Sequence, residues 1–331
     1  MPADRLIGLS TEQAVIAVLA GASLAETAAA ARVEPTDLVE AARIYRLGGR
    51  QALTLQQAGN WRQIYVRFLD WDASEQNAVT HLAPLLHQAE AEGWISTWWF
   101  IRKHPCWRLR LMPGPAADPH QDPIGTALNH LVEGNAIHSW WPGVYEAETA
   151  AFGGEDAMAV AHQLFHDDSR AILRLLAGNN TGLGRRELSL LLCGTLLHSA
   201  GLEWYEQGDV WHRVAQERPL PSDVPNRNLA AMADSFRTLM LADTTGTGAL
   251  FNANGPLTHA ADWAESFRHA GKIVGFRTKT GSLQRGLRDL LSYHIIFHWN
   301  RLGLPARQQS ILAWAARGAI LGPCSKSLPA G

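Results

Sequence analysis

Cysteine is scarce in the 331-residue chain, and no long hydrophobic run occurs in it. The three cysteines lie far apart and form no CxxC pair: Cys106, Cys193 and Cys324. Neither a disulfide framework nor a thiolate zinc site is therefore predicted. No stretch approaches the ~20 apolar residues of a membrane span, and the apolar segment 15–31 is preceded by Glu12 and interrupted by Glu26. A pair of helices is expected there instead of a signal peptide, so we predict a cytoplasmic protein with no membrane partner.

The chain also has no large excess of positive or negative residues. The chain carries 29 Lys and Arg residues against 31 Asp and Glu, for a formal net charge of -2. Proteins that bind nucleic acid present a basic surface to the phosphates, so this balance argues against a nucleic-acid partner. The sequence TTGTGALF, which ends at Phe251, contains glycines but neither follows a predicted strand nor opens a βα unit. It does not predict a nucleotide-binding loop.

Two pairs of histidines have the i, i+4 spacing of metal ligands on one helical face: His162 with His166, and His294 with His298. A metalloprotease helix with this spacing also carries a glutamate next to the first histidine. Gln163 takes that place in the first pair, and neither pair has an evident third ligand. The sequence therefore predicts no metal site and no cofactor.

Tryptophan is abundant, with 13 residues. Many of them are grouped along the chain: Trp94, Trp98, Trp99 and Trp107, followed by Trp140 and Trp141. Large amphipathic rings of this kind line protein cores and peptide-binding surfaces. Two interpretations stay open, a Trp-rich core and an aromatic surface for a large organic substrate. Under the second, Trp99, Trp107 and Trp141 are the candidate substrate contacts.

Residues 8–50 predict three short helices with the lengths and spacing of a helix-turn-helix. Ser10 and Ser23 each precede a helix and are followed three residues later by Gln or Glu, which is the pattern of a capping box. The third helix is expected to end at Gly48-Gly49, because glycine commonly terminates a helix. A polar linker is expected over 53–60.

The charges of this N-terminal module, residues 1–52, nearly cancel. Its would-be recognition helix begins with Asp37 and Glu40, which would meet the phosphates of DNA with the wrong sign. DNA binding is therefore not expected. The module is predicted instead to pack against another part of the protein or to dock a peptide.

From Trp61 onward the hydrophobic period changes. Alternating segments predict strands over 62–70, 95–104 and 106–114, with a further extended stretch over 138–148. Helical periods lie between them and dominate the chain from residue 155 to 321. The prediction is an α+β fold with a small antiparallel sheet, a mostly helical C-terminal half and the short N-terminal three-helix module. The predicted domain boundaries are 61–322 for the α+β domain and 323–331 for a flexible tail.

Two arginines share one side of a predicted strand. In the sequence WRLRL, Arg108 and Arg110 point to the same side because side chains alternate along a strand. Neighbouring guanidinium groups repel each other, so such a pair commonly faces an anion or carbonyl oxygens. An exposed strand face is the alternative interpretation.

A helix is expected to begin near Ser282 and to run to Gly303. At 3.6 residues per turn, polar and small residues fall near one stripe: Ser282, Gly286, Asp289, Tyr293 and Asn300. Asp289 and Tyr293 are one turn apart and can form a hydrogen-bonded pair. A stripe that faces water is the alternative, but the long apolar run around it favours a polar site. Asn300 and Arg301 are expected to be structural.

Three segments, in order, resemble one protein family. WRQIYVRFL with WWFIRKHPCWRLRLMPG resembles the opening of the C-terminal domain of lantibiotic dehydratases and of related thiopeptide biosynthesis proteins. VYEAETAAFGGEDAMAVAHQLFHDDSRAIL is similar to the family's YxxE…(R)YGG pattern and its helix with FHxDS. HIIFHWNRLG resembles the closing helix, which carries an HMxxNR signature. The resemblance spans residues 61–303 and implies the same fold. In dehydratases, this domain eliminates glutamate from glutamylated Ser and Thr of a leader-bearing peptide.

Two positions depart from the family pattern. Ile296 occupies the place of the eliminating histidine, and Ala151 replaces the arginine before the glycine turn, whereas Arg108 and Arg110 are retained. An aliphatic side chain cannot transfer a proton, so elimination is not expected. These losses match the pyridine synthases of thiopeptide antibiotics, which join two dehydroalanines of a linear azole-bearing peptide by a formal aza-[4+2] cycloaddition. Loss of water and of the leader as a carboxamide completes the pyridine of the macrocycle.

The reaction implied by the resemblance requires weak acids and bases near the reacting amide. Tyr293 is the first candidate, as hydrogen-bond donor or acid, and Ser282 is the second. Asp289 and His198 are further candidates. Arg108 and Arg110 are expected to hold carbonyls or acidic residues of the leader. The implied partner is a modified precursor peptide, with a leader and an azole-containing core.

Three alternatives are kept. A glutamate-elimination enzyme could use His294 or His298 as a repositioned base. A non-catalytic scaffold could bind the leader through Arg108, Arg110 and the N-terminal module. A transcription regulator could use the N-terminal helices, although their charge disfavours it. A homodimer is left open.

Overall fold

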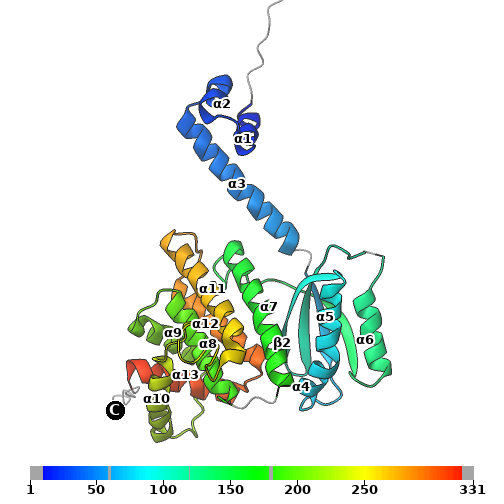
Figure 1. Ribbon diagram of the computed structural model, residues 1–331, viewed down its shortest axis with the longest axis vertical. Coiled ribbons are helices and arrows are strands. Elements are labelled where there is room, and N and C mark those ends of the chain that lie inside the picture. The colour runs from blue at the N-terminus through cyan, green and yellow to red at the C-terminus, as the bar shows by residue number, and fades with distance from the viewer. Residues whose placement is uncertain (1–9, 59–60, 119, 179–181, 323–331) are drawn as a thin grey trace, which may run out of the picture. The chain divides into compact units, whose positions relative to one another are not determined.

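The computed structural model describes residues 10–58, 61–118, 120–178 and 182–322. The chain divides into two compact units, Met1–Gly59 and Asn60–Gly331. Each unit is described by itself, with the elements labelled as in Figure 1. Within the described ranges, no helix combines the length and the hydropathy that crossing a bilayer requires.

The N-terminal unit consists of three helices: α1 (Thr11–Leu19), α2 (Leu24–Ala31) and α3 (Pro35–Ala58). The capping box predicted at Ser10 is confirmed, since its hydroxyl accepts from the Gln13 backbone N–H and the Gln13 side chain accepts from the Ser10 N–H. Ser23 is the N-cap of α2 but makes no capping hydrogen bond through its side chain. The buried hydrophobic cluster of this unit is built from small and aliphatic residues: Ala14, Val15, Ala28, Leu38 and Ala42.

The third helix is longer than predicted. It passes through Gly48-Gly49 and continues to Ala58, so the predicted helix end is wrong, and so is the predicted linker as far as Ala58. Each glycine costs a helix about 1 kcal/mol relative to alanine. The neighbouring Leu, Arg, Gln and Ala residues are strong helix formers, which explains why the helix continues across the glycines.

The second unit contains one four-stranded antiparallel sheet, formed by β1 (Arg62–Arg67), β2 (Ile95–Lys103), β3 (Cys106–Pro113) and β4 (Ser139–Val144). The strand order is β2-β3-β1-β4. The predicted α+β class, the small antiparallel sheet and the mostly helical C-terminal half are therefore confirmed. The order places β2 and β4 at the two edges, with β3 and β1 in the middle.

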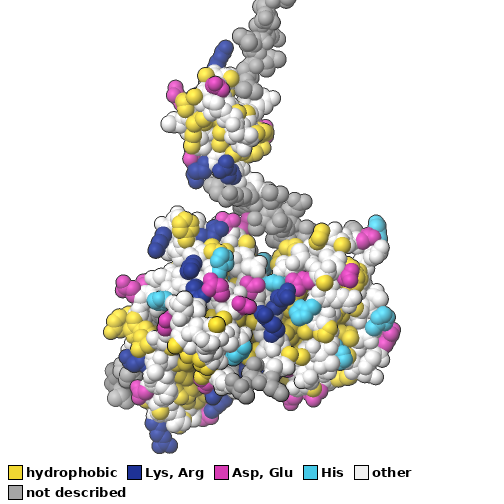
Figure 2. Space-filling model, viewed as in Figure 1, with side chains coloured by type: hydrophobic (Ala, Val, Ile, Leu, Met, Phe, Trp, Pro, Cys, Tyr) yellow, Lys and Arg dark blue, Asp and Glu magenta, His cyan; other side chains and the backbone are white. Residues whose placement is uncertain are grey.

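Helices occupy most of the rest of this unit. Between the strands lie α4 (Ser74–Asn77), a π-helical turn (Ala78–Leu82), α5 (Ala83–Ala91) and α6 (Pro123–Glu133). After β4 follow α7 (Glu155–Ala177), α8 (Arg185–Ser199), α9 (Trp204–Glu217), α10 (Asn226–Met240), a 3-10 turn (Thr258–Ala260), α11 (Ala261–Lys279), α12 (Leu287–Leu302) and α13 (Ala306–Leu321). Figure 1 shows α7 between the sheet and the other C-terminal helices. Figure 2 shows acidic and basic side chains interspersed on one face, in keeping with the near-neutral charge.

The last helix of the predicted site begins later than expected. It starts at Leu287 with Gly286 as its N-cap, so the expected start near Ser282 is wrong. The Ser282 hydroxyl donates to the Arg277 carbonyl at the end of α11, over 3.3 Å. The Gln284 N–H donates to the Gly153 carbonyl over 2.9 Å. These contacts hold residues 282–286 as a connection instead of a first helical turn.

Two hydrophobic clusters organise the second unit. The larger one packs the inner surfaces of most helices against one face of the sheet. The smaller one, here called the aromatic cluster, lies on the other face and contains Trp61, Trp99, Ile101, Phe152, Met158, Ala161, Phe165 and Phe297. A Trp-rich core is confirmed, because the side chains of five tryptophans are almost completely buried: Trp98, Trp99, Trp107, Trp211 and Trp299.

Candidate functional site

Polar and aromatic side chains share the sheet face that carries the aromatic cluster. The register pairs Gln63 with Arg110 and Tyr65 with Arg108 between β1 and β3. Because directly paired residues point to the same face, strands β2 and β4 add Trp99 and Trp141 through their own pairings. We call this set, with Tyr145, the basic-aromatic face: Gln63, Tyr65, Trp99, Arg108, Arg110, Trp141 and Tyr145.

Arg110 is a buried cation at the centre of this face, with only 8% of its surface exposed. Its Nε donates to the Gln63 side-chain oxygen over 3.0 Å, and its guanidinium lies 4.2 Å from the Trp99 ring centre. Burial lowers the pKa of Arg110 to about 10, so it remains charged at neutral pH. Its Nη1 has no hydrogen-bond partner among the described residues. A buried donor of this kind is suited to a carbonyl or carboxylate oxygen of a ligand.

A second part of the face is a stack that reaches solvent. The Arg108 guanidinium lies 5.4 Å from the Tyr65 ring centre, and Tyr65 stacks on Trp141 at 5.3 Å with an angle of 10°. Trp141 is 40% exposed. Gly143 leaves room for this arrangement, because a Cβ at its position would lie 2.4 Å from the Tyr65 ring. The stack offers a flat aromatic surface to planar groups of a ligand.

A neutral hydrogen-bonded pair adjoins Arg110. The Tyr145 hydroxyl and His162 Nε2 are 2.8 Å apart. Burial raises the pKa of Tyr145, while burial and then the nearby Arg110 lower the pKa of His162 to about 4. The Trp61 ring lies 4.6 Å from the imidazole. Both groups are therefore uncharged at neutral pH, and they can orient each other without a salt bridge.

Helix α12 brings Tyr293 to the edge of the aromatic cluster. The half-buried Tyr293 ring lies 6.3 Å from Phe152 and 4.7 Å from the Arg285 guanidinium. The next residue, His294, is buried, with its Nδ1 unpartnered within the described residues. Burial, with the nearby Arg301, lowers the pKa of His294 to about 3. His294 is therefore a neutral core residue.

The lowered pKa values of His162 and His294 predict a loss of folding stability in mild acid. The unfolded chain takes up their protons near pH 6.5, whereas the folded protein does not until about pH 4 for His162 and about pH 3 for His294. Stability is therefore lost as pH falls from 6.5 towards these values, by ~1.4 kcal/mol per pH unit and histidine. The free energy of unfolding in urea should be lower at pH 5 than at pH 6 by ~2.4 kcal/mol from these two histidines. His294→Asn should remove about half of that difference, and an equal slope in both proteins would contradict it.

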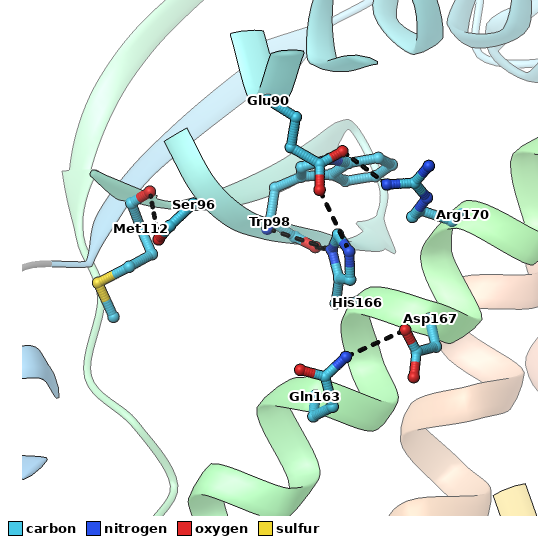
Figure 3. A network of polar contacts seen from close by, with 8 residues as sticks. All are labelled: Glu90, Ser96, Trp98, Met112, Gln163, His166, Asp167 and Arg170. Atoms are coloured by element: carbon cyan, nitrogen blue, oxygen red, sulfur yellow. Dashed lines mark hydrogen bonds and ion pairs between the residues drawn. The ribbon is translucent and has the colours of Figure 1, made fainter. Parts of the chain in front are cut away.

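The segment FHDDS on α7 has a structural role that the sequence analysis did not assign. His166 Nδ1 lies 2.8 Å from the Trp98 carbonyl, and the Ser169 hydroxyl accepts from the Phe100 N–H over 3.2 Å. Both contacts cover backbone groups of the edge strand β2, which would otherwise be unpaired. Figure 3 shows His166 held between Trp98 and Glu90, with Arg170 on the same carboxylate.

Asp168 anchors the closing helix through a buried ion pair. Its carboxylate accepts from Arg301 Nε at 2.7 Å, lies 2.9 Å from His298 Nδ1 and accepts from Trp263 Nε1 at 2.9 Å. Asp168, His298 and Arg301 have no exposed surface. Burial opposes ionisation, but His298 and Arg301 still hold the pKa of Asp168 below its usual value. The expected structural role of Arg301 agrees with this contact.

The structure does not bring all predicted site residues together. Ser282 is exposed in the connection before α12. Asp289 pairs with Arg213 of α9, and within the described ranges it shares no hydrogen bond with Tyr293. His198 is exposed at the end of α8, where it lines a cavity of about 610 Å³ with Glu203 and Asp243.

Trp107 also lies away from the basic-aromatic face. Its side chain is on the opposite face of the sheet, where it stacks on Phe100 at 4.6 Å and contacts Phe68. It belongs to the main hydrophobic core because helices cover that face as well. Arg108, Arg110, Trp99 and Trp141 do lie together.

Several members of the site were missed at the sequence level. Gln63, Tyr65 and Tyr145 are not among the predicted site residues, and His162 is considered there only as a metal ligand, although Gln63 and Tyr65 alternate on RQIYVR as the two arginines do on WRLRL. Shared alternation on two antiparallel strands is the signal that could have found Gln63 and Tyr65. Across the described residues, no group of three or more His, Cys, Asp or Glu side chains is arranged to hold a metal ion.

The family model described as lantibiotic biosynthesis dehydratase C-terminal domain matches residues 61–320. The chain therefore belongs to this family, and the resemblance found in the sequence is confirmed. No curated protein matches the sequence significantly.

Two solved structures share the fold. The first is the tRNA-dependent lantibiotic dehydratase MibB from Microbispora sp. 107891, at 21% identity and a TM-score of 0.57, covering 80% of this chain and 28% of that one. The second is the pyridine synthase TbtD from thiomuracin biosynthesis, at 14% identity and a TM-score of 0.54, covering 79% of this chain and 97% of that one. The chain thus spans about 28% of the dehydratase's length.

Proposed function

We propose that this protein is a pyridine synthase of thiopeptide biosynthesis that acts in the cytoplasm. In this proposal it joins two dehydroalanines of a leader-bearing, azole-containing peptide by a formal aza-[4+2] cycloaddition. Water and the leader carboxamide are then lost, which leaves a pyridine at the centre of the macrocycle. The family membership and the fold shared with a pyridine synthase support this proposal.

The observation that carries the proposal is the absence of a usable base on α12. Ile296, at the position expected for an eliminating histidine, is an aliphatic residue of the main core. The two histidines that could replace it, His294 and His298, are 2% and 0% exposed. His298 is held by Asp168, and His294 is kept neutral by burial. Glutamate elimination through either histidine is therefore disfavoured.

The basic-aromatic face supports binding of a folded peptide. Its buried cation, Arg110, has a free donor for a carbonyl oxygen, and the exposed Trp141 ring offers a stacking surface for an azole. Holding two alkenes of one peptide in contact can supply ~7–11 kcal/mol of the barrier. The Tyr293 hydroxyl, at the edge of the aromatic cluster, is the proposed hydrogen-bond donor to the azadiene. Ser282, Asp289 and His198 carry less support, because the structure places them in other contacts.

Replacing Arg110 tests the binding role. Arg110→Met should weaken binding of the leader-bearing peptide by ~10–100-fold, because a charge-assisted hydrogen bond contributes ~1.5–3 kcal/mol. Binding of a fluorescein-labelled peptide, followed by anisotropy, measures the change. Arg62→Met is the matched control on the same sheet, since Arg62 is exposed and pairs with Asp122. Equal weakening by both substitutions would argue against a specific role for Arg110.

Two peptide substrates discriminate the proposed function from its main alternative. Purified protein should convert a synthetic bis-dehydroalanine, azole-bearing peptide with its leader into macrocycle and leader carboxamide. The same preparation should release no glutamate from a glutamylated peptide. Free glutamate without macrocycle would identify an elimination enzyme instead. Binding of both peptides without either product would identify a leader-binding scaffold.

A further inference from the structure

We propose that Arg285 is a positioning residue that fixes the Tyr293 ring and binds a carbonyl oxygen of the peptide substrate beside it. The inference rests on the proposed function, and it names one further contact of the same site. Arg285 lies in the connection between α11 and α12, in the segment where the sequence predicts the start of α12. Its guanidinium carbon is 4.7 Å from the Tyr293 ring centre.

The hydrogen bonding of Arg285 is incomplete. Its Nε is buried and has no partner among the described residues. A guanidinium that stacks on a ring through its face keeps its N–H groups free at the edge. A buried N–H without an acceptor is costly, so this donor is suited to an oxygen atom that arrives with a ligand.

The neighbouring arginines differ from Arg285 in that each pairs with a carboxylate, although the Nε of Arg277 also lacks a partner among the described residues. Arg288, one turn into α12, pairs with Asp209 at 3.1 Å and Glu206 at 3.8 Å. Arg277, at the end of α11, pairs with Asp156 at 2.8 Å. Across the described residues, Arg285 makes no ion pair with a carboxylate. The guanidinium groups of Arg277 and Arg288 are thus each paired with a carboxylate, whereas that of Arg285 is left for another group.

The backbone around Arg285 is held against the glycine turn that precedes α7. The Gln284 N–H donates to the Gly153 carbonyl over 2.9 Å. A Cβ on Gly154 would lie 2.8 Å from the Gln284 side chain, and the φ of Gly154 is 104°. Only glycine tolerates this approach without strain. The turn therefore fixes the connection and, with it, the position of Arg285 over Tyr293.

This arrangement places a cation and a phenol side by side at the edge of the aromatic cluster. Tyr293 packs against Phe152, and the ring of Phe297 lies 5.0 Å from Phe152, so the apolar side of the corner is closed. An amide oxygen of the peptide can then accept from Tyr293 and Arg285 together. Two donors on one oxygen hold the amide in a single orientation, which is what a cycloaddition between fixed alkenes requires.

Three variants test the inference: Arg285→Met, Arg285→Lys and the control Arg288→Met. Arg285→Met should raise KM for the bis-dehydroalanine peptide by about tenfold or more and lower kcat/KM by ~10–100-fold. Arg285→Lys should recover part of the loss, because it keeps the charge without the planar stacking. Arg288→Met should leave both constants within twofold, and all variants should share one melting temperature.

Anisotropy of the fluorescein-labelled peptide gives a second readout that does not depend on turnover. Arg285→Met should bind the peptide about tenfold more weakly than the wild type, and unchanged affinity together with unchanged kcat/KM would overturn the inference. If the wild type forms no macrocycle, the proposed function fails. Weaker binding by Arg285→Met alone would then still support the contact, whereas equal binding would reject it.

Discussion

Tyr293→Phe is expected to lower macrocycle formation by ~10²–10⁴-fold, the range that a positioned proton donor contributes. The substitution removes only the hydroxyl, and the ring can keep its contacts with Phe152 and Arg285. Stability should therefore change little. The rate of product formation under saturating peptide, measured by mass spectrometry, tests this expectation.

Tyr205→Phe is the matched control, because Tyr205 is 72% exposed on α9. It should retain the wild-type rate. If Tyr293→Phe also retains the rate within a fewfold, the phenol is not the donor. A binding scaffold, or a donor elsewhere on the site, would then fit better.

Asp168→Ala is expected to destabilise the folded protein by about 3–5 kcal/mol. It would leave the fully buried Arg301 without its carboxylate and would remove the acceptor of His298 and Trp263. The loss of an ion-pair partner in the core costs more than the pair itself contributes. Urea unfolding monitored by tryptophan fluorescence measures the change.

The adjacent carboxylate provides the control for this prediction. Asp167 is less buried and accepts from Gln163 over 3.1 Å, as Figure 3 shows, so Asp167→Ala should change stability by no more than about 0.5 kcal/mol. The double variant Asp168→Leu, Arg301→Met should be more stable than Asp168→Ala, because it leaves no unpaired buried charge. Equal stability of Asp168→Ala and the wild type would contradict the anchoring role.

The sheet could be predicted because its physical signal is local. Alternation over 106–114 and 95–104 specifies strands, and the same alternation places Arg108 and Arg110 on one face. Alternation along a strand does not reveal that helices also cover the opposite face of the sheet. From the sequence alone, Trp107 can either contact the substrate or belong to the core. Because helices pack on both faces of the sheet, Trp107 belongs to the core.

The C-terminal helix shows a different limit of sequence reasoning. The periodic stripe from Ser282 to Asn300 predicts one helix, but the helix begins only at Leu287, with Gly286 as its N-cap. The preceding connection is set by a hydrogen bond to Gly153, which lies 131 positions earlier in the chain than Gln284 (284 minus 153). Contacts of that separation leave no periodic trace in a single sequence.

The geometry of the candidate site depends on such contacts throughout. Arg110 could be expected to face a polar group, but its enclosure by Gln63 and Trp99 requires three strands in register. The pairing of Tyr145 with His162 joins the segment after β4 to α7. Residue types and periodicity predicted which strand would matter, whereas the arrangement of the donors required the folded chain.

The most direct measurement is incubation of the purified protein alone with a leader-bearing, bis-dehydroalanine, azole-containing peptide, followed by mass spectrometry. The proposed function predicts two products from one linear peptide, a pyridine-centred macrocycle and the leader peptide as its carboxamide, with loss of one water. Tyr293→Phe should leave the linear peptide almost unchanged in the same time. Unchanged peptide with the wild-type protein, from a substrate that another pyridine synthase converts, would contradict the account.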